Sequence, residues 1–426
     1  MGDVLIKNGR VIDPANSVDG VMDVLVSKGK IAKVAKKINA SASNVIDAKG
    51  KWVTPGLIDI HVHLREPGFE YKETIETGSQ SAAAGGFTSI ACMANTYPVN
   101  DNASVTERII DIARQQAVVN VYVIGAVTKG LDGKELADIG EMAEKGIVAL
   151  SDDGKCVMDA GLMRSAMEYA SMFNLPIIEH AEDCNLARNG VMNEGAVSSA
   201  LGLAGQPKAT EDAIVARDIA LAEYLGAHIH IAHVSSANSV TLIREAKKRG
   251  VNITAEVTPH HFTITDETCL GYNTNAKMAP PLREQADMAK LRAGLKNGSI
   301  DCIATDHAPH DVSEKEVEFD HAAFGIVGLE TAIPLSLALV RDGVLTPLKL
   351  IETMTVNPAK IIGIDRGTLS AGAVADVTII DPDSEWTVDP AKFKTKGKNT
   401  PFAGMRVQGK VNMTMVKGKV VYEEKS

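Results

Sequence analysis

Histidine and aspartate side chains stand at the ends of short apolar runs along this chain. Residues i and i+2 of an extended strand point to the same face, so His61 and His63 can bind one ion from a single rigid element. Imidazole and carboxylate ligands suit borderline divalent metals such as zinc. The set predicts a metal site, which no member would predict alone. Its members are His61 and His63 in GLIDIHVH, Asp153 in SDDG, His180 in IIEH, His233 in IAHV and Asp306 in ATDH.

A metal site of this composition would catalyse hydrolysis. Water bound to zinc loses a proton near neutral pH, and the resulting hydroxide can attack an amide or imide carbonyl. Asp306 is the candidate acid and base that takes the proton of the attacking water and passes it to the departing nitrogen. Its alternative role is metal ligation alone. Asp153 can bridge two ions or serve one ion with fewer ligands, so these residues leave the metal count open.

Three further polar residues follow the same runs and could recognise a substrate. Arg65 lies two residues beyond His63, where a guanidinium could bind a substrate carboxylate bidentately. Asn95 ends a run in MANT, and His310 follows Asp306 by four residues. Taken singly, they would be a surface ion-pair partner, a turn residue and a loop histidine. We expect them to converge on a carboxylate-binding site.

The segments that carry these residues alternate with stretches of helical periodicity between residues 55 and 365. Eight strands separated by helices predict an α/β fold, the TIM-type (β/α)8 barrel, which places chemistry at the carboxyl ends of its strands. One helix is predicted over ATEDAIVARDIALAEYLG, with Thr210 as its N-cap and Gly226 as its terminator. The predicted strands are GLIDIHV, FTSIACM, VNVYVIGAV, GIVALSD, LPIIEH, HIHIAHV, VNITAEV and SIDCIATD.

Both ends of the chain have a different character. Residues 1–54 consist of short alternating runs separated by Asn-Gly and Lys-Gly turns, which predicts antiparallel strands and hairpins. The pattern returns over residues 366–426, in GTLSAGAVADVTIID and KVNMTMVKGKVVYEE. We predict that 1–54 and 366–426 are the two parts of one small β-sandwich domain, and that 55–365 is the catalytic barrel.

Composition narrows the partners of the protein. The 426 residues are 45% apolar and 23% charged, as in an ordinary globular protein. A net charge of -10 opposes nucleic-acid binding, and no apolar run reaches the roughly 18 residues of a membrane span. We expect a small-molecule substrate, no nucleic-acid or membrane partner and, without a signal-peptide pattern, a cytoplasmic protein. Five scattered cysteines without a CxxC pair predict free thiols rather than disulfides or a catalytic cysteine.

Short motifs along nearly the whole chain resemble those of the amidohydrolase superfamily, and more closely those of the bacterial dihydroorotases. The resemblance implies reversible, zinc-dependent cyclisation of N-carbamoyl-L-aspartate to L-dihydroorotate with loss of water, an early step of pyrimidine synthesis. It implies one or two Zn²⁺ ions per subunit, with two favoured. It leaves open a homodimer and a complex with aspartate transcarbamoylase. The motifs are HVHLREPG, MANT, SDDG, IIEHAED, AEVTPHH, KMAPPLR, ATDHAPH and FGIVGLE.

The resemblance also assigns roles to single residues. Asp306 would act as acid and base. The loop of residues 311–323 resembles a mobile loop that closes over the site, and its alternative is an exposed surface loop. The implied metal ligands are His61, His63, Asp153, His180, His233 and Asp306. The implied substrate contacts are His63, Arg65, Asn95, Ala279, His310, Phe324 and Gly325.

Two positions depart from the wider family pattern. Many amidohydrolases bridge their metals through a carboxylated lysine, but the matching position here is Asp153, as in one branch of bacterial dihydroorotases. Lys155 is close enough along the chain to offer a lysine bridge instead. Ala279 stands where relatives often carry asparagine, so a contact there would come from the backbone.

Two rival functions are open to such a chain. A hydantoinase, dihydropyrimidinase or allantoinase would act on cyclic amides that lack the carboxylate of dihydroorotate, and Arg65 and Asp153 argue against it. A non-catalytic homologue that scaffolds another pyrimidine-pathway enzyme would be expected to lose metal ligands. This chain keeps them all.

Overall fold

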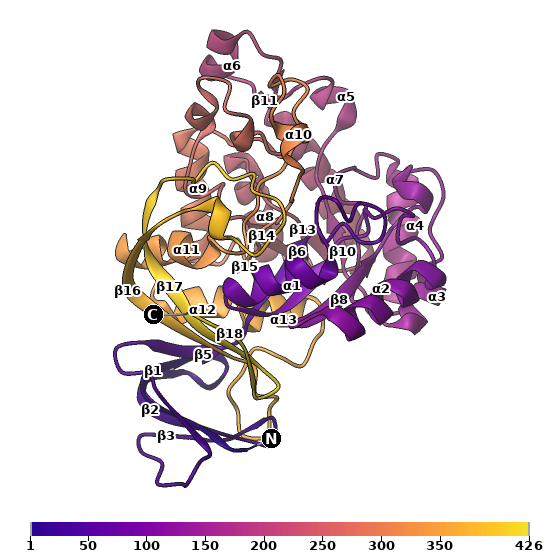
Figure 1. Ribbon diagram of the computed structural model, residues 1–426. Coiled ribbons are helices and arrows are strands. Elements are labelled where there is room, and N and C mark those ends of the chain that lie inside the picture. The colour runs from indigo at the N-terminus through magenta and orange to yellow at the C-terminus, as the bar shows by residue number, and fades with distance from the viewer. Residues whose placement is uncertain (1, 425–426) are drawn as a thin grey trace.

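The computed structural model describes residues 2–424, and its central feature is a sheet of eight parallel strands wound into a nearly closed barrel (Figure 1). Every neighbouring pair from β6 to β15 is parallel. A parallel bridge between Val62 and His307 links β6 to the segment after β15. The predicted barrel is confirmed. Its strands are β6 (Leu57–Val62), β7 (Phe87–Cys92), β8 (Asn120–Gly125), β9 (Ala149–Leu150), β10 (Ile177–Glu179), β13 (Ile229–Ile231), β14 (Ile253–Val257) and β15 (Cys302–Ile303).

Helices connect these strands, and short polar side chains begin several of them. Thr74 and Asn102, for example, accept backbone N–H groups of the first helical turn that would otherwise have no partner. The longer helices are α1 (Ile75–Ala84), α2 (Ala103–Gln116), α3 (Ile139–Lys145), α4 (Ala160–Ser171), α7 (Ala209–Leu225), α8 (Ala237–Lys248), α9 (Gln285–Asn297), α11 (Ala332–Arg341), α12 (Pro347–Thr353) and α13 (Val356–Ile361).

The helix α7 begins two residues earlier than an N-cap at Thr210 predicts. It starts at Ala209, so the prediction of Thr210 as its N-cap is wrong. The Thr210 hydroxyl instead donates to the carbonyl oxygen of Pro207 over 2.7 Å. Gly226 ends the helix in the left-handed conformation, as predicted, because glycine has no Cβ to penalise it.

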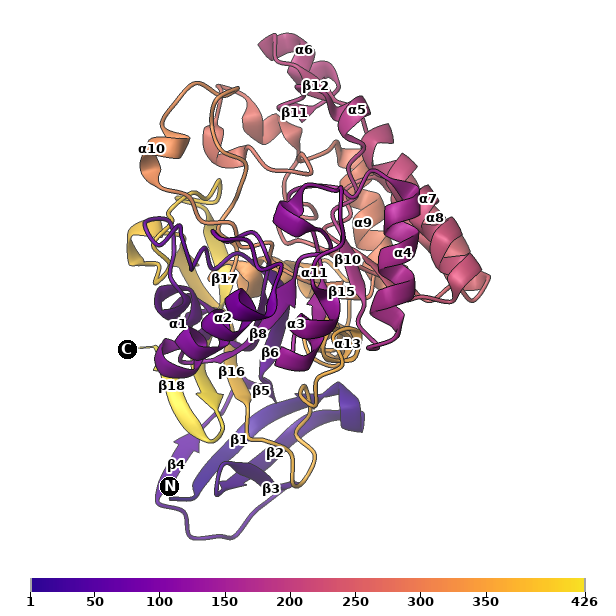
Figure 2. The same ribbon diagram turned by 90° about the vertical axis from the view of Figure 1, so that its right-hand side faces the viewer.

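Short elements extend the barrel at the end opposite to β1, β2 and β3 (Figures 1 and 2). The loop of residues 311–323 is among them and contains a single helical turn, α10 (Val312–Lys315). The others are α5 (Cys184–Ala187), β11 (Met192–Asn193), α6 (Ala196–Leu201), β12 (Gly205–Gln206), η3 (Asp266–Cys269) and η4 (Thr274–Ala276), with η2 (Lys129–Leu131) after β8.

The two chain ends build one separate sheet of eight strands in the order β18-β17-β16-β5-β1-β2-β3, with β4 beside β1. The strand β5 lies between β1 and β16. It is antiparallel to β16 but parallel to β1, as β4 is, so the prediction of antiparallel pairing is wrong for these two contacts. The strands are β1 (Val4–Asp13), β2 (Val18–Ser27), β3 (Lys30–Ala35), β4 (Asn44–Asp47), β5 (Trp52–Pro55), β16 (Val377–Thr387), β17 (Arg406–Val416) and β18 (Lys419–Glu423), with η1 (Pro14–Asn16) and η5 (Pro390–Lys392) between them.

The boundaries at residues 54/55 and 365/366 stay predictions. Residues 388–405, between β16 and β17, leave the terminal sheet and contact the carboxyl end of the barrel: Lys396 donates to the carbonyl oxygen of Glu70, and Asn399 donates to that of Ala308. The region predicted as the second part of the β-sandwich thus also contributes to the carboxyl end of the barrel.

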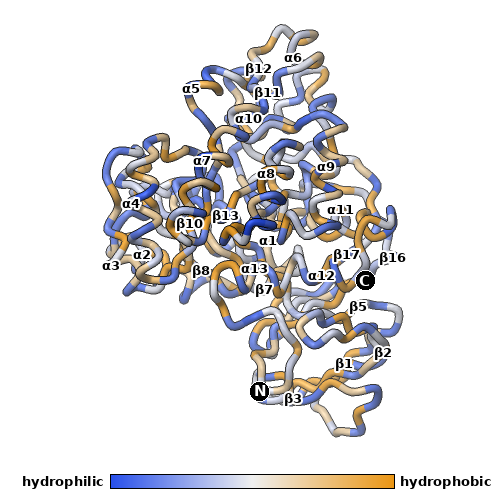
Figure 3. Tube along the Cα trace, turned by 180° about the vertical axis from the view of Figure 1, so that it is seen from behind, coloured by the Kyte–Doolittle hydropathy of each residue, from blue (hydrophilic) through white to orange (hydrophobic). Residues whose placement is uncertain are grey.

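Apolar residues concentrate along the barrel strands (Figure 3). All six residues of β6 and all six of β7 are buried, as expected of parallel strands that are covered on both faces. All five cysteines are free, as predicted, and Cys184 alone among them is exposed. Among the described residues, no helix combines the length and apolar character needed to cross a bilayer.

Candidate active site

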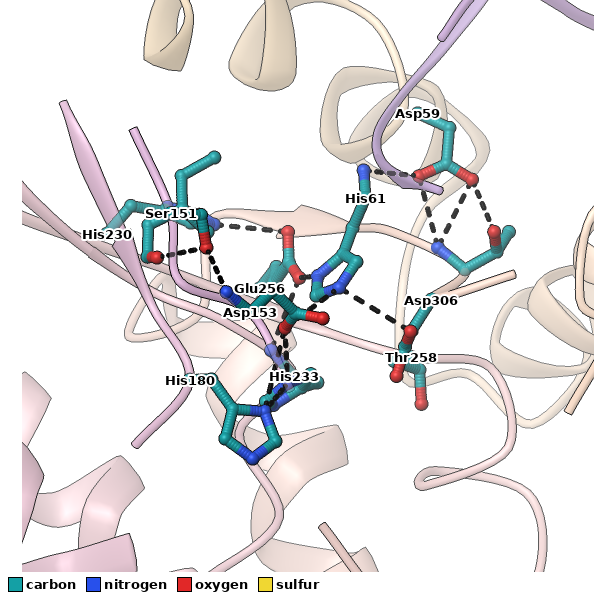
Figure 4. Close-up of polar contacts among 12 residues, drawn as sticks. Asp59, His61, Ser151, Asp153, His180, His230, His233, Glu256, Thr258 and Asp306 are labelled. Atoms are coloured by element: carbon teal, nitrogen blue, oxygen red, sulfur yellow. Dashed lines mark hydrogen bonds and ion pairs between the residues drawn. The ribbon is translucent and has the colours of Figure 1, made fainter. Parts of the chain in front are cut away.

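All six predicted metal ligands meet at the carboxyl end of the barrel, and Figure 4 shows five of them, His61, Asp153, His180, His233 and Asp306. His61 lies on β6 and His63 directly after it, and the other four follow β9, β10, β13 and β15. Each side chain is buried, with at most 5% of its residue surface exposed. The parallel register of the strands brings their ends to one edge, so residues far apart in sequence converge.

The ligand atoms form three overlapping groups, each with its atoms within 4.8 Å of one another: His61, His63 and Asp153; Asp153, His180 and His233; and His61, His233 and Asp306. Asp153 lies between two of these groups. Its Oδ2 is 3.3 Å from His63 Nε2, and its Oδ1 is 3.4 Å from His233 Nε2. Within residues 2–424, the buried atoms His61 Nε2 and Asp153 Oδ1 have no hydrogen-bond partner. This donor set fits a divalent metal.

The electrostatics of the cluster suit a cation. Burial alone would raise the pKa of Asp153, but the facing His61, His180 and His233 hold it well below its ordinary value. Burial is likewise outweighed at Asp306, whose pKa is lowered by His61 and His63. Both carboxylates are therefore ionised at neutral pH. A metal would displace protons from the histidines, because imidazole binds metal in its neutral form.

Two acidic residues that sequence reasoning missed hold His61 in place. Glu256 on β14 is fully buried; its Oε1 accepts from His61 Nδ1 over 2.6 Å, and its Oε2 accepts from His230 Nε2 over 3.2 Å. Asp59 accepts from the backbone N–H of His61 over 3.0 Å and from the Thr305 hydroxyl over 2.6 Å. Glu256 is placed to fix the tautomer and orientation of the His61 imidazole, whereas Asp59 holds its backbone. An acid inside a predicted strand, as in GLIDIHV and VNITAEV, was the signal available.

Three residues of the cluster region have backbones in the left-handed region. The φ angles are 61° at Arg65, 30° at His233 and 47° at Asp306. This conformation is unfavourable for residues other than glycine and concentrates at functional sites, where the surrounding structure must hold it.

The predicted substrate residues surround His63. Its Nδ1 lies 2.9 Å from Asn95 Oδ1. The Arg65 guanidinium donates to the carbonyl oxygen of Pro309 over 3.3 Å and lies 3.5 Å from His310 Nε2. It forms no ion pair within residues 2–424, although burial lowers its pKa and nearby acids act in the opposite direction. The surface ion-pair alternative is thus excluded within the described chain, and the guanidinium is available to an anion.

The remaining predicted contacts lie on two neighbouring segments. His310 Nε2 bonds to the carbonyl oxygen of Phe324 at 2.8 Å, and the Gly325 N–H donates to the carbonyl oxygen of Lys277 over 3.0 Å. A Cβ on Gly325 would lie 2.7 Å from the carbonyl oxygen of Ala308, so only glycine fits there. Ala279 follows two residues after Lys277. The side chain of Lys155 is exposed, so a lysine bridge at that position lacks support from the structure.

Asn399, in the segment between β16 and β17, is a further residue that sequence reasoning missed. Its side chain is 4% exposed and joins the predicted substrate residues. The amide oxygen accepts from the His310 N–H over 3.0 Å, and the amide nitrogen donates to Ala308 over 2.9 Å and to Gly325 over 3.0 Å. Nothing in the local sequence KGKNTPF predicted this contact, because the partners lie far away along the chain.

Two known protein families match this chain. Residues 50–239 match the family described as dihydro-orotase-like, and residues 199–422 match the amidohydrolase family. A dihydroorotase of Syntrophus aciditrophicus is 55% identical over 99% of both chains, and one of Pelotomaculum thermopropionicum is 56% identical over the same shares. The solved L-hydantoinase (dihydropyrimidinase) of Arthrobacter aurescens has a TM-score of 0.90 and 30% identity, covering 100% of this chain and 97% of its own. The chain is therefore a cyclic amidohydrolase and belongs to the dihydroorotase-like branch of the amidohydrolase family.

Proposed function

We propose that the protein is a zinc-dependent dihydroorotase, which interconverts N-carbamoyl-L-aspartate and L-dihydroorotate plus water in pyrimidine synthesis. The observation that carries the substrate assignment is the Arg65 guanidinium. It lies beside the His and Asp cluster and has no acidic partner within the described chain. The curated relatives named dihydroorotase support the same reading.

The six clustered side chains would hold the proposed zinc, as one ion or two, with two favoured. When bound, zinc supplies a Lewis acid and lowers the pKa of water. Asp306 then holds the proton in transit: in the hydrolytic direction it takes a proton from the attacking water as the new C–O bond forms, and it delivers that proton to the ring nitrogen as the C–N bond breaks. Cyclisation runs through the same steps in reverse. An ionised Asp306 is suited to begin hydrolysis as the base.

We assign recognition of the ring carboxylate to Arg65, Asn95 and His310. The backbone around Ala279 and the Phe324–Gly325 pair would contact the rest of the ring. Carboxylate recognition separates this substrate from hydantoin and dihydrouracil, which carry no such group. The likeness to the L-hydantoinase does not decide between them, because related folds serve many substrates.

The test is a direct comparison of substrates with zinc-loaded protein. We expect turnover of dihydroorotate and carbamoyl-aspartate, with little turnover of dihydrouracil or allantoin. Metal analysis should find one or two zinc ions per chain. Preference for dihydrouracil or allantoin would contradict the proposal. The assay should be run on the protein alone and on its mixture with an aspartate transcarbamoylase, and the oligomeric state of the protein should be measured. Activity only in the mixture would mean that the partner completes the site.

A further inference from the structure

Two buried lysines meet at the loop that ends in Phe324 and Gly325: Lys315 lies within the loop, and Lys277 lies on the segment against it. Lys277 is 2% exposed and Lys315 is 3% exposed. Neither forms an ion pair with a carboxylate in the part of the chain that the structure describes. Buried lysines are rare unless they are paired, because an ammonium group loses its hydration on burial. The reaction proposed above uses neither of them.

Backbone carbonyl groups take the place of acids around both ammonium groups. Lys315 Nζ donates to Ala323 over 2.7 Å, to Gly325 over 3.2 Å and to Lys277 over 3.4 Å. Lys277 Nζ donates to the carbonyl oxygens of Phe319 over 2.8 Å and Asp320 over 3.0 Å. Four of the five acceptor carbonyl groups belong to residues 319–325, and the fifth belongs to Lys277. The two side chains therefore connect segments that share no regular secondary structure.

Lys277 also contacts an aromatic ring of the loop. The Lys277 ammonium lies over the ring of Phe324, 4.5 Å from its centroid. Burial and repulsion by the nearby Lys277 ammonium lower the pKa of Lys315 to about 7, so Lys315 is only partly protonated at neutral pH. A methionine would fill the same space without this repulsion, but it would leave the carbonyl groups without their donors. The carbonyl contacts are what offset the cost of the two charges.

The end of the loop forms part of the proposed substrate site. The carbonyl oxygen of Phe324 bonds to His310 Nε2 at 2.8 Å, and that nitrogen lies 3.5 Å from the Arg65 guanidinium. The Gly325 N–H donates back to Lys277 over 3.0 Å. Movement of Phe324 and Gly325 would thus change the surroundings of the guanidinium directly.

We propose that Lys277 and Lys315 are positioning residues: they fasten the 311–325 loop to the 277–280 segment and thereby fix Phe324, Gly325 and His310 for substrate binding. Neither lysine touches the substrate. The fastening itself is independent of the reaction, whereas its effect on binding rests on the proposed dihydroorotase function.

The first test measures amide hydrogen exchange in metal-loaded protein without substrate. The variants are Lys277→Met and Lys315→Met, with Lys134→Met as a control at an exposed lysine. We expect exchange in the 311–325 peptide to quicken by at least about tenfold in both test variants, the factor expected when a hydrogen bond to a charged group is lost. The terminal sheet and the metal content should not change, and the control should match the native protein.

The second test measures kinetics on the same proteins. We expect KM for dihydroorotate to rise by roughly tenfold or more while kcat changes by less than about threefold, because the chemical groups stay in place. Lys315→Arg keeps a positively charged donor and should restore part of the slow exchange. If a methionine variant does not fold, Lys315→Gln and Lys277→Gln take its place, and we expect faster exchange and a higher KM in them as well.

Each outcome decides the proposal. Native-like exchange in both methionine variants would show that the lysines do not fasten the loop. Faster exchange with an unchanged KM would show that the loop does not position the substrate residues. If native protein does not turn over dihydroorotate, the proposed function fails, yet the exchange experiment still tests the fastening.

Discussion

Replacing Glu256 by glutamine should weaken metal binding without disturbing the fold. The carboxylate is ionised, because His61 and His230 lower its pKa despite the opposing effect of burial. Glutamine has the same size: its oxygen can still accept from His61 Nδ1, and its NH2 group can face His230 if that ring changes tautomer. What is lost is the charge behind the 2.6 Å bond to His61. Removing such a partner costs about 10- to 100-fold in metal affinity, which is about 1.4 to 2.7 kcal/mol.

The assay is competition for zinc with a chromogenic chelator at fixed pH. Glu179→Gln is a matched control, since Glu179 is also fully buried, on β10 next to His180. Its carboxylate accepts from Cys156 Sγ over 3.0 Å rather than from an imidazole. Burial and the nearby Asp218 raise its pKa well above the ordinary value, so the amide resembles its protonated form. The role assigned to Glu256 would be refuted if Glu256→Gln bound zinc with native affinity, or if Glu179→Gln lost as much zinc affinity as Glu256→Gln.

Three further outcomes are expected. Arg65→Ala should raise KM for dihydroorotate by roughly 100-fold, the size of a lost charge-assisted pair, while metal analysis finds native zinc content; a parallel loss of metal would contradict a role in substrate binding alone. Asn399→Ala removes three buried hydrogen bonds to the backbone of Ala308, His310 and Gly325. It should raise KM for dihydroorotate about tenfold with little change in kcat. An unchanged KM would show that Asn399 does not position the site. Burial raises the pKa of Glu330 to about 7, so the folded state binds more protons than the unfolded state and loses stability as pH rises from about 4.5 through 7. Glu330→Gln does not titrate, and its stability relative to the native protein in urea melts should therefore increase by on the order of 2 to 3 kcal/mol between pH 4.5 and pH 8; a pH-independent difference would contradict the assignment.

The barrel, and the clustering of the six residues predicted to bind metal, could be foreseen because each of these residues lies at the end of an apolar run. A parallel barrel gathers strand ends, so recognising the runs was enough to expect that His180 and Asp306 would meet. Asp59 and Glu256 were visible only as acids within apolar strands. Whether such an acid bonds to a ligand or to a neighbouring strand depends on the register between strands, which single runs do not encode.

The contacts of Asn399 and Lys315 around the proposed substrate site were harder to predict, because their partners are backbone groups outside regular secondary structure. Asn399 bonds to residues some 70 to 90 positions earlier. Lys315 Nζ donates hydrogen bonds to the carbonyl oxygens of Ala323 and Gly325, in a loop with almost no regular secondary structure. Backbone acceptors exist at every position, so no residue pattern marks the ones that a side chain will reach. The parallel pairing of β5 with β1 was missed for a similar reason, since turn signals predict only local hairpins.

The central place of β5 in the terminal sheet bears on how the protein folds as it is synthesised. One edge of β5 pairs with β1 soon after it emerges, whereas its other edge pairs Pro55 with Val377 and Trp52 with Ile380. At a translation rate of about 5 to 20 residues per second, that second edge waits on the order of tens of seconds for its partner. An unpaired edge is a template for pairing with other chains. We therefore expect the terminal sheet to be completed last, and nascent chains that stop before β16 to be the species most prone to aggregate.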